Sequence, residues 1–154
     1  MAPKHLLIVY HSKDGKTGKM AEALNIGATD PELAVECRFK TARESDMDDL
    51  LWSDGVIFGT PENFGYMSGA LKDFFDRTFY EVEGRVEGTP YCIFVGAGND
   101  GTGALNSIRR ICNGYNFREV LEPVLVVGKI SNKDLERCHE LGMAMAAGIE
   151  AGIF

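Results

Sequence analysis

Residues 6–18 read LLIVYHSKDGKTG, and this stretch decides the class of fold. Its first five residues form an apolar run, which is typical of a strand that is covered on both faces. A loop of small, polar and charged residues follows, and then Met20, Ala21, Leu24 and Ala28 recur at helical spacing. A strand that passes through a short loop into an amphipathic helix is half of a βαβ unit.

The same alternation of strand and helix patterns continues along the chain. Strands are predicted at Leu6–Tyr10, Leu33–Phe39, Val56–Gly59, Tyr91–Val95 and Pro123–Val127. Further helical stripes are formed by three sets of residues, Leu71, Phe74 and Phe75, then Leu105, Ile108, Ile111 and Cys112, then Leu135, Cys138, Leu141, Met145 and Ile149, with a short connection at Asp46–Trp52. We therefore expect an α/β three-layer sandwich whose five-stranded parallel sheet has the order 2-1-3-4-5.

Length and composition indicate a single domain, residues 1–154. The chain has 154 residues, of which 45% are hydrophobic, enough for one core. Its 16 Lys and Arg residues against 23 Asp and Glu residues give a net charge of −7, which disfavours nucleic acid and anionic membranes as partners. With no apolar run near ~18 residues and no signal-peptide pattern, we expect a cytoplasmic protein without membrane insertion.

The four cysteines are Cys37, Cys92, Cys112 and Cys138. They are far apart and show neither C-x-x-C nor metal-ligand spacing, so no metal site is expected. We interpret them as reduced thiols of the core, with one redox-active thiol as the alternative.

The loop after the first predicted strand, residues 11–18, is typical of a phosphate cradle. Glycine and small hydroxyl residues allow backbone N–H groups to converge, and the start of the following helix adds positive potential. Ser12 and Thr17 supply hydroxyl groups. An N-capped turn without a ligand is the alternative.

Other phosphate-binding motifs fit this loop poorly. Gly15-Lys16-Thr17 ends the nucleotide triphosphatase motif G-x-x-x-x-G-K-[ST], but Tyr10 stands where its first glycine belongs. The third predicted strand does not end in an aspartate that could bind magnesium, and the dinucleotide motif G-x-G-x-x-G is absent after the first strand. A phosphoacceptor receiver domain is disfavoured because neither strand 1 nor strand 3 ends in aspartate.

Two more loops belong to the same edge of the predicted sheet, because the carboxyl ends of parallel strands meet there. Residues 59–69, GTPENFGYMSG, combine proline and glycines with Phe64 and Tyr66, which suits packing on a flat ring; a surface turn with both aromatics tucked under it is the alternative. Residues 96–103, GAGNDGTG, are nearly without side chains, so backbone amides can approach a polar, pyrimidine-like edge. We place Gly98 closest to that edge, with a backbone that needs positive φ.

Three motifs carry a resemblance to a known family over most of Lys4–Gly128. They are IVYHSxxGxT at residues 8–17, DGVIFGTPxxFGxMxG at residues 54–69, and Gly84-x-Val86-x-Gly88-x-Pro90. The chain resembles the flavodoxin-like superfamily, within it the tryptophan-repressor-binding-protein type of NAD(P)H:quinone oxidoreductases and FMN reductases. The resemblance implies a flavodoxin-like fold that binds FMN in the three loops.

The implied cofactor-binding residues fall into three groups. Ser12, Lys13, Asp14, Gly15, Lys16 and Thr17 belong to the phosphate loop; Pro61, Glu62, Asn63, Phe64 and Gly65 flank the flavin; Ala97, Gly98, Asn99 and Gly101 bind its pyrimidine edge. The chain departs from the T-x-T-G-x-T pattern of short electron-carrier flavodoxins, has no aromatic residue in the third loop, and lacks the long insertion and the histidine that many quinone reductases carry after strand 4. A counterpart of their tryptophan just past helix 3 is also missing.

Two functions follow from the resemblance. The first is an enzyme that takes electrons from NAD(P)H at the uncovered flavin face and passes them to a quinone or similar acceptor; the flavin supplies the chemistry, so no catalytic side chain is expected. The second is a flavodoxin-type carrier, or FMN-binding module, that docks to redox proteins. The partner is then a small-molecule acceptor or a redox protein, and a homo-oligomer is left open.

Overall fold

A computed structural model describes residues 2–13 and 15–154. The elements follow in the order β1 (Lys4–Tyr10), α1 (Lys16–Ala28), β2 (Val35–Thr41), α2 (Met47–Trp52), β3 (Gly55–Asn63), β4 (Tyr66–Met67), α3 (Gly69–Val82), β5 (Pro90–Ala97), α4 (Thr102–Tyr115), β6 (Arg118–Glu119), β7 (Val124–Val127) and α5 (Asn132–Ala151).

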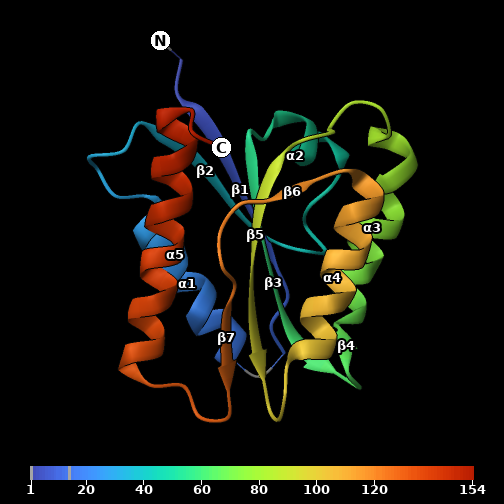
Figure 1. Ribbon diagram of the computed structural model, residues 1–154, viewed down its shortest axis with the longest axis vertical. Coiled ribbons are helices and arrows are strands. Elements are labelled where there is room, and N and C mark those ends of the chain that lie inside the picture. The colour runs from blue at the N-terminus through green and yellow to red at the C-terminus, as the bar shows by residue number, and fades with distance from the viewer. Residues whose placement is uncertain (1, 14) are drawn as a thin grey trace.

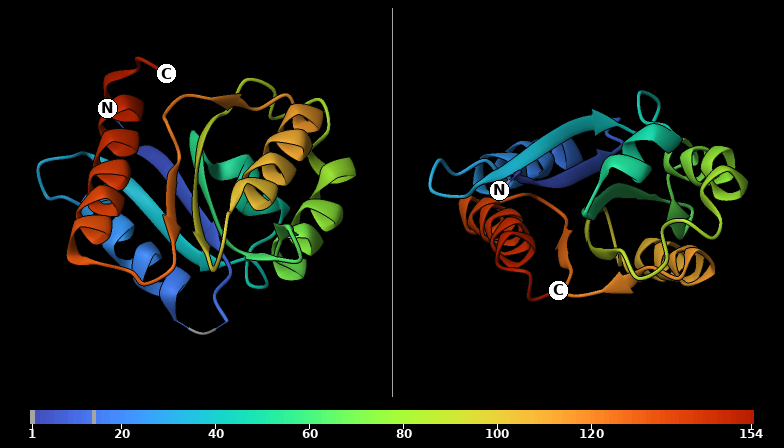
Figure 2. Two further views of the ribbon diagram at one scale, coloured as in Figure 1. Left: turned by 60° about the horizontal axis from the view of Figure 1, so that its bottom comes forward. Right: turned by 90° about the horizontal axis from the view of Figure 1, so that it is seen from above.

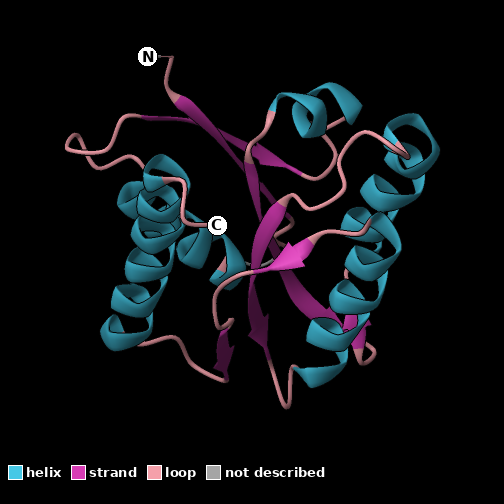
Figure 3. Ribbon diagram, turned by 45° about the horizontal axis from the view of Figure 1, so that its top comes forward, coloured by secondary structure: helices cyan, strands magenta, loops and turns pink. Residues whose placement is uncertain are grey.

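The predicted three-layer architecture is confirmed. The sheet order is β2-β1-β3-β5, and the outer position beside β5 is filled first by β6 and then by β7. All of these pairs are parallel. Helices α1 and α5 cover one face of the sheet and α3 and α4 the other (Figures 1 and 3).

Alternating side chains of the sheet build two separate cores. In β1, Leu7 and Val9 pack with the side chains of α3 and α4, whereas Leu6 and Ile8 pack with those of α1 and α5. All four side chains are fully buried. The uninterrupted apolar run of the sequence is thus explained by a strand covered on both faces.

The structure corrects several predicted strand boundaries. Strand β2 begins at Val35 because the N–H of Leu33 donates to the Asp30 carbonyl in a turn. Strand β3 continues through Asn63, because it forms an antiparallel hairpin with β4. The two-residue strands β4 and β6 were not predicted, since two residues carry no periodic signal.

The fifth predicted strand is interrupted. On β5, Tyr91 pairs with Glu119 of β6 and Phe94 pairs with Val124 of β7. Between these two pairs β5 advances by three residues and its neighbour by five, so two extra residues separate β6 from β7. The sequence predicted only the second part of this strand.

Close packing of α1 against α5 fixes the direction of α1. A Cβ atom on Gly27 would overlap the carbonyl oxygen of His139, and one on Gly142 would overlap that of Leu24. The two helix backbones therefore touch without side chains between them. Because α1 starts at the carboxyl edge of the sheet, this contact also positions its N-terminus.

The cysteine side chains lie where the sequence predicted. Cys92, Cys112 and Cys138 are buried, Cys37 is half-buried, and all four are free. Burial raises the pKa of the Cys37 thiol to about 11, and burial likewise raises that of Cys138 to about 11. These thiols stay protonated at neutral pH, which disfavours a reactive thiolate. In the described part of the chain, no helix has the length and apolar character to cross a membrane.

Candidate functional site

The three loops singled out in the sequence lie at one edge of the sheet. Figure 2, left, brings this edge forward, with the β1–α1 loop, the β3–β4 hairpin and the β5–α4 loop next to one another. A cavity of about 320 Å³ opens between them, at the lower end of the ~300–1,000 Å³ range of small-molecule sites. Its lining residues are Lys13, Lys16, Pro61, Glu62, Asn63, Gly96 and Gly98.

The first loop leads into the open N-terminus of α1. Gly15, the residue before the helix, has φ 99° and provides no side-chain cap. The N–H of Gly18 donates to Ser12 Oγ at 3.0 Å, while the N–H groups of Lys16 and Thr17 have no acceptor among residues 2–13 and 15–154. Such unpaired groups at a positive helix end suit a phosphate. Asp14, also predicted here, lies outside the described residues.

The side chain of Lys16 contacts the ends of two strands. Its ammonium group donates to the carbonyl oxygens of Ala97 at 2.5 Å and Gly128 at 2.7 Å. Lys16 was predicted to hold phosphate; in the structure its ammonium is engaged at the ends of β5 and β7. No local sequence pattern indicates this contact, because the partners are 81 and 112 residues away.

Partial burial and, to a lesser extent, the charge of Arg43 lower the pKa of His11, so this imidazole of the first loop is predominantly neutral at pH 7. Its backbone N–H donates to the Gly59 carbonyl at 3.1 Å. His11 therefore connects the first loop to β3, and its side chain adds little positive charge.

The second loop is a β-hairpin rather than an irregular loop. Glu62 pairs with Met67 and Asn63 with Tyr66, and the two turn residues Phe64 and Gly65 both have positive φ, 52° and 69°. This is the backbone of a two-residue hairpin turn that matches strand twist. Pro61, Glu62 and Asn63 are consequently part of β3.

Phe64 stands out in this turn. A bulky residue with positive φ is strained, and here its side chain is also completely exposed. Tyr66 is 41% exposed. The alternative that both aromatics are tucked under the loop is therefore wrong, because both rings are exposed to solvent.

Glu62 connects the second loop to the third. Its carboxylate accepts hydrogen bonds from the N–H groups of Gly101 at 3.0 Å and Ala104 at 3.1 Å. A negative charge at this position stabilises the N-terminus of α4. Glu62 was predicted to flank the flavin; the structure gives its side chain this contact between loops.

In the third loop, Ala97 is the last residue of β5, and Gly98, Asn99 and Asp100 are exposed. A Cβ atom on Gly98 would meet no protein atom within 4 Å, and its φ is not positive. The expected positive φ at Gly98 is therefore wrong. It occurs instead at Gly101, φ 86°, where the backbone turns into α4.

Gly96 is a lining residue that the predicted set omitted. A Cβ atom there would lie 3.1 Å from Thr17 Oγ1 and 3.2 Å from Lys16 Cε. The missing side chain thus lets α1 approach β5. Its signal was present in the sequence, as the first residue of the glycine-rich third loop.

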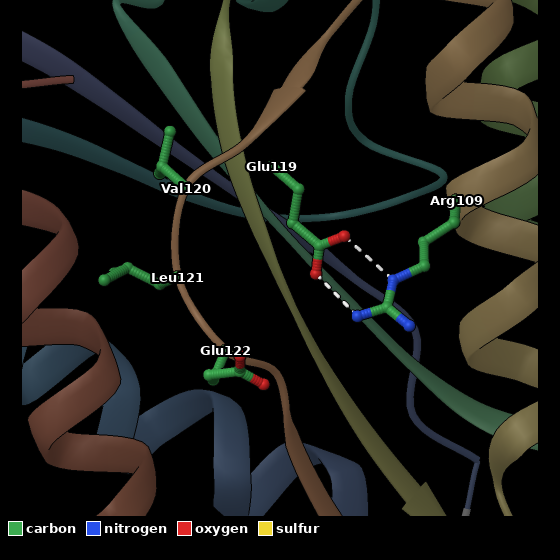
Figure 4. A pocket seen from close by; sticks show the side chains of 5 residues that line it. All are labelled: Arg109, Glu119, Val120, Leu121 and Glu122. Atoms are coloured by element: carbon green, nitrogen blue, oxygen red, sulfur yellow. Dashed lines mark hydrogen bonds and ion pairs between the residues drawn. The ribbon is translucent and has the colours of Figure 1, made fainter.

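A larger cavity, about 490 Å³, lies at the break between β6 and β7 (Figure 4). There the Nε and Nη2 atoms of Arg109 donate to the two carboxylate oxygens of Glu119 at 2.8 and 2.9 Å. These charges satisfy each other, and the cavity is remote from the three loops. The smaller cavity lies between the three loops, so it is the candidate site.

Residues 11–132 match the model of the NADPH-dependent FMN reductases. The chain belongs to this family. It is 37% identical over 158 residues to a flavodoxin of Aquifex aeolicus, which covers 92% of the chain and 84% of that protein. It is also 37% identical over 110 residues to an NAD(P)H dehydrogenase (quinone) of Acidithiobacillus ferrooxidans, but that match covers 58% of the chain and only 55% of the relative.

The fold is that of flavodoxins. A flavodoxin from the domain Archaea superimposes with a TM-score of 0.80 at 24% identity, over 94% of the chain and 98% of that structure. This superposition confirms the predicted fold. Family membership confirms the predicted superfamily and the predicted cofactors, FMN with NAD(P)H.

The described residues fit FMN. A helix N-terminus with unpaired N–H groups lies at one side of the cavity, and an exposed loop with open space above Gly98 lies at the other. Backbone amides at both ends match a ligand with a phosphate and a ring that carries carbonyl oxygens. The assignment of each residue to a part of the cofactor stays a prediction.

Proposed function

We propose that the chain holds FMN between the three loops, accepts electrons from NAD(P)H and passes them to a quinone or similar small acceptor. The α1 N-terminus with Ser12 and Thr17 binds the phosphate. The hairpin and the third loop hold the ring, and Gly98 lies at its pyrimidine edge. Bound FMN supplies the redox chemistry, and the protein binds and orients it.

The observation that carries the enzymatic proposal is the third loop. Residues 98–100 are exposed and none of them is aromatic, so this loop offers no side chain that stacks over the ring. One face of the ring then remains open to a nicotinamide. Amides of this loop stabilise negative charge that develops on the ring edge during reduction.

The second candidate is an electron carrier. It is supported by the similarity to the Aquifex flavodoxin over 84% of that protein's length. In this case the exposed rings of Phe64 and Tyr66 contact a redox protein. The net charge of −7 attracts a partner that carries basic groups. Either function agrees with the proposed cytoplasmic location.

Anaerobic mixing of the FMN-loaded protein with NADPH, and separately with NADH, distinguishes the two. The reductase predicts rapid bleaching of the flavin absorbance in one two-electron step, followed by recovery when a quinone is added. Bleaching that occurs only with dithionite, in two separate one-electron stages, contradicts the reductase and supports the carrier.

A further inference from the structure

The Lys16 side chain connects the carboxyl ends of the neighbouring strands β5 and β7. Its ammonium group binds the carbonyl oxygens of Ala97 and Gly128, and the N–H of Gly128 in turn donates to Ala97 at 2.9 Å. The three residues therefore form a small network at the base of the third loop. Hydrogen bonds from a charged donor are about twice as strong as neutral ones, so this network is a firm anchor.

The local sequence makes room for this contact. Gly96 lies directly under the lysine stem, and a side chain there would press on Lys16 Cε at 3.2 Å. At the other end of the loop, Glu62 holds the N–H of Gly101. Residues 98–100 are thus anchored at both ends, by the Lys16 ammonium group of the first loop and by the Glu62 carboxylate of the second.

The contact also acts on the peptide group that reaches the cavity. The Ala97 carbonyl and the Gly98 N–H belong to one planar trans peptide, so they point in opposite directions. A cation bound to the carbonyl oxygen polarises this group and makes its N–H a stronger donor. Gly98 lines the cavity, and its N–H has no acceptor among residues 2–13 and 15–154.

We propose that Lys16 is a positioning residue for the flavin ring, which anchors and polarises the Ala97–Gly98 peptide so that the Gly98 N–H binds the polar ring edge. Its ammonium group does not neutralise the phosphate. This inference rests on the proposed FMN site. It predicts that substitution of Lys16 changes the affinity for flavins with and without a phosphate by the same factor.

The test compares the dissociation constants of FMN and riboflavin, which lacks the phosphate, for the wild type, Lys16→Met and Lys16→Arg. Lys16→Met weakens the binding of both flavins by about tenfold, or about 1.4 kcal/mol, and leaves the ratio of their dissociation constants unchanged. Lys16→Arg, which keeps a charged donor, restores most of the affinity. The matched control is Lys13→Met, which makes the same charge change at an exposed lysine of the same loop. We expect it to weaken the binding of FMN and to leave that of riboflavin unchanged.

A second measurement is made on the FMN-free protein. Amide hydrogen exchange of Gly128, whose N–H donates to the Ala97 carbonyl, becomes faster in the FMN-free Lys16→Met or Lys16→Gln variant and stays as in the wild type in Lys13→Met. The assignment is overturned if Lys16→Met lowers the affinity for FMN and leaves that for riboflavin unchanged, or if the exchange of the Gly128 amide stays as in the wild type. A wild type that binds neither flavin refutes the proposed function itself, independently of Lys16.

Discussion

A substitution at Gly98 separates the effect on ligand binding from the effect on folding. Because a Cβ atom there meets only open space and φ is not positive, the fold tolerates a substitution. We predict that Gly98→Val weakens FMN binding by well over tenfold, about 1.4 kcal/mol or more, through collision with the ring. Thermal unfolding of the FMN-free variant and titration with FMN measure the two effects.

The control for this variant is Ile108→Ala. Ile108 is completely buried in α4, so the cavity left behind lowers the free energy of unfolding by about 2–5 kcal/mol. The folded fraction of Ile108→Ala still binds FMN. If Gly98→Val binds FMN as tightly as the wild type does, the third loop does not contact the ring.

At the residue scale, the sequence predicted which loops form the site better than it predicted what each side chain does. Glycines and small residues at strand ends predicted the loops because they constrain the local backbone. The contacts of Lys16 with Gly128 and of Glu62 with Ala104 join segments 112 and 42 residues apart. Such contacts depend on the tertiary arrangement, which no local spacing encodes.

The α1–α5 contact gives a prediction at the scale of elements. Gly142→Ala places a methyl group against the Leu24 carbonyl, and the helices must move apart. We expect the free energy of unfolding to fall by about 1–3 kcal/mol, as in other overpacked cores. Denaturant unfolding measures the change. The matched control is Gly114→Ala on α4, where the methyl group enters open space and removing glycine stabilises the helix.

A second prediction at this scale concerns the link between α2 and β2. The carboxylate of Asp49, almost fully buried, accepts from Arg38 at 3.0 Å and Lys40 at 2.8 Å. Burial alone raises the pKa of Asp49, but the hydrogen bonds from Lys40, from the Asp46 N–H and from Arg38 outweigh it and hold the pKa below its ordinary value.

Because the folded-state pKa of Asp49 is lowered, its stabilising contribution is complete above the ordinary pKa of about 4 and is lost as the pH falls through the folded value. We predict that Asp49→Asn is less stable than the wild type at pH 7, by about 1–3 kcal/mol, and that the difference shrinks below pH about 4. Urea unfolding at several pH values measures it. A difference that stays constant down to pH about 2 contradicts this role.

Elements were predictable where burial leaves a regular apolar pattern. The stripe on α5 and the continuous run of β1 identified their elements, because burial selects apolar residues at fixed spacing. The β3–β4 hairpin was missed because its turn carries Phe64 where Asn or Gly is usual, so no hairpin signal was present. The break between β6 and β7 has no signal of its own, since it depends on the register with β5.

At the scale of the whole molecule, parallel topology explains why three weak local signals combine into one site. Strands β1, β3 and β5 are neighbours and parallel, so the loops at their carboxyl ends meet at a single edge. The order was predictable from the alternation of strands and helices. The extent of the cavity was not, because it depends on where the Lys16 and Glu62 side chains lie.

The most direct test of the FMN site is to compare the dissociation constants of FMN and riboflavin for the wild-type protein at one ionic strength. The two ligands differ by the phosphate that the α1 N-terminus, Ser12 and Thr17 are proposed to bind. Charge-assisted hydrogen bonds to several amides predict a preference for FMN of more than about 100-fold. Equal affinities for the two flavins would contradict a phosphate site at the N-terminus of α1, and with it the proposed arrangement of the three loops.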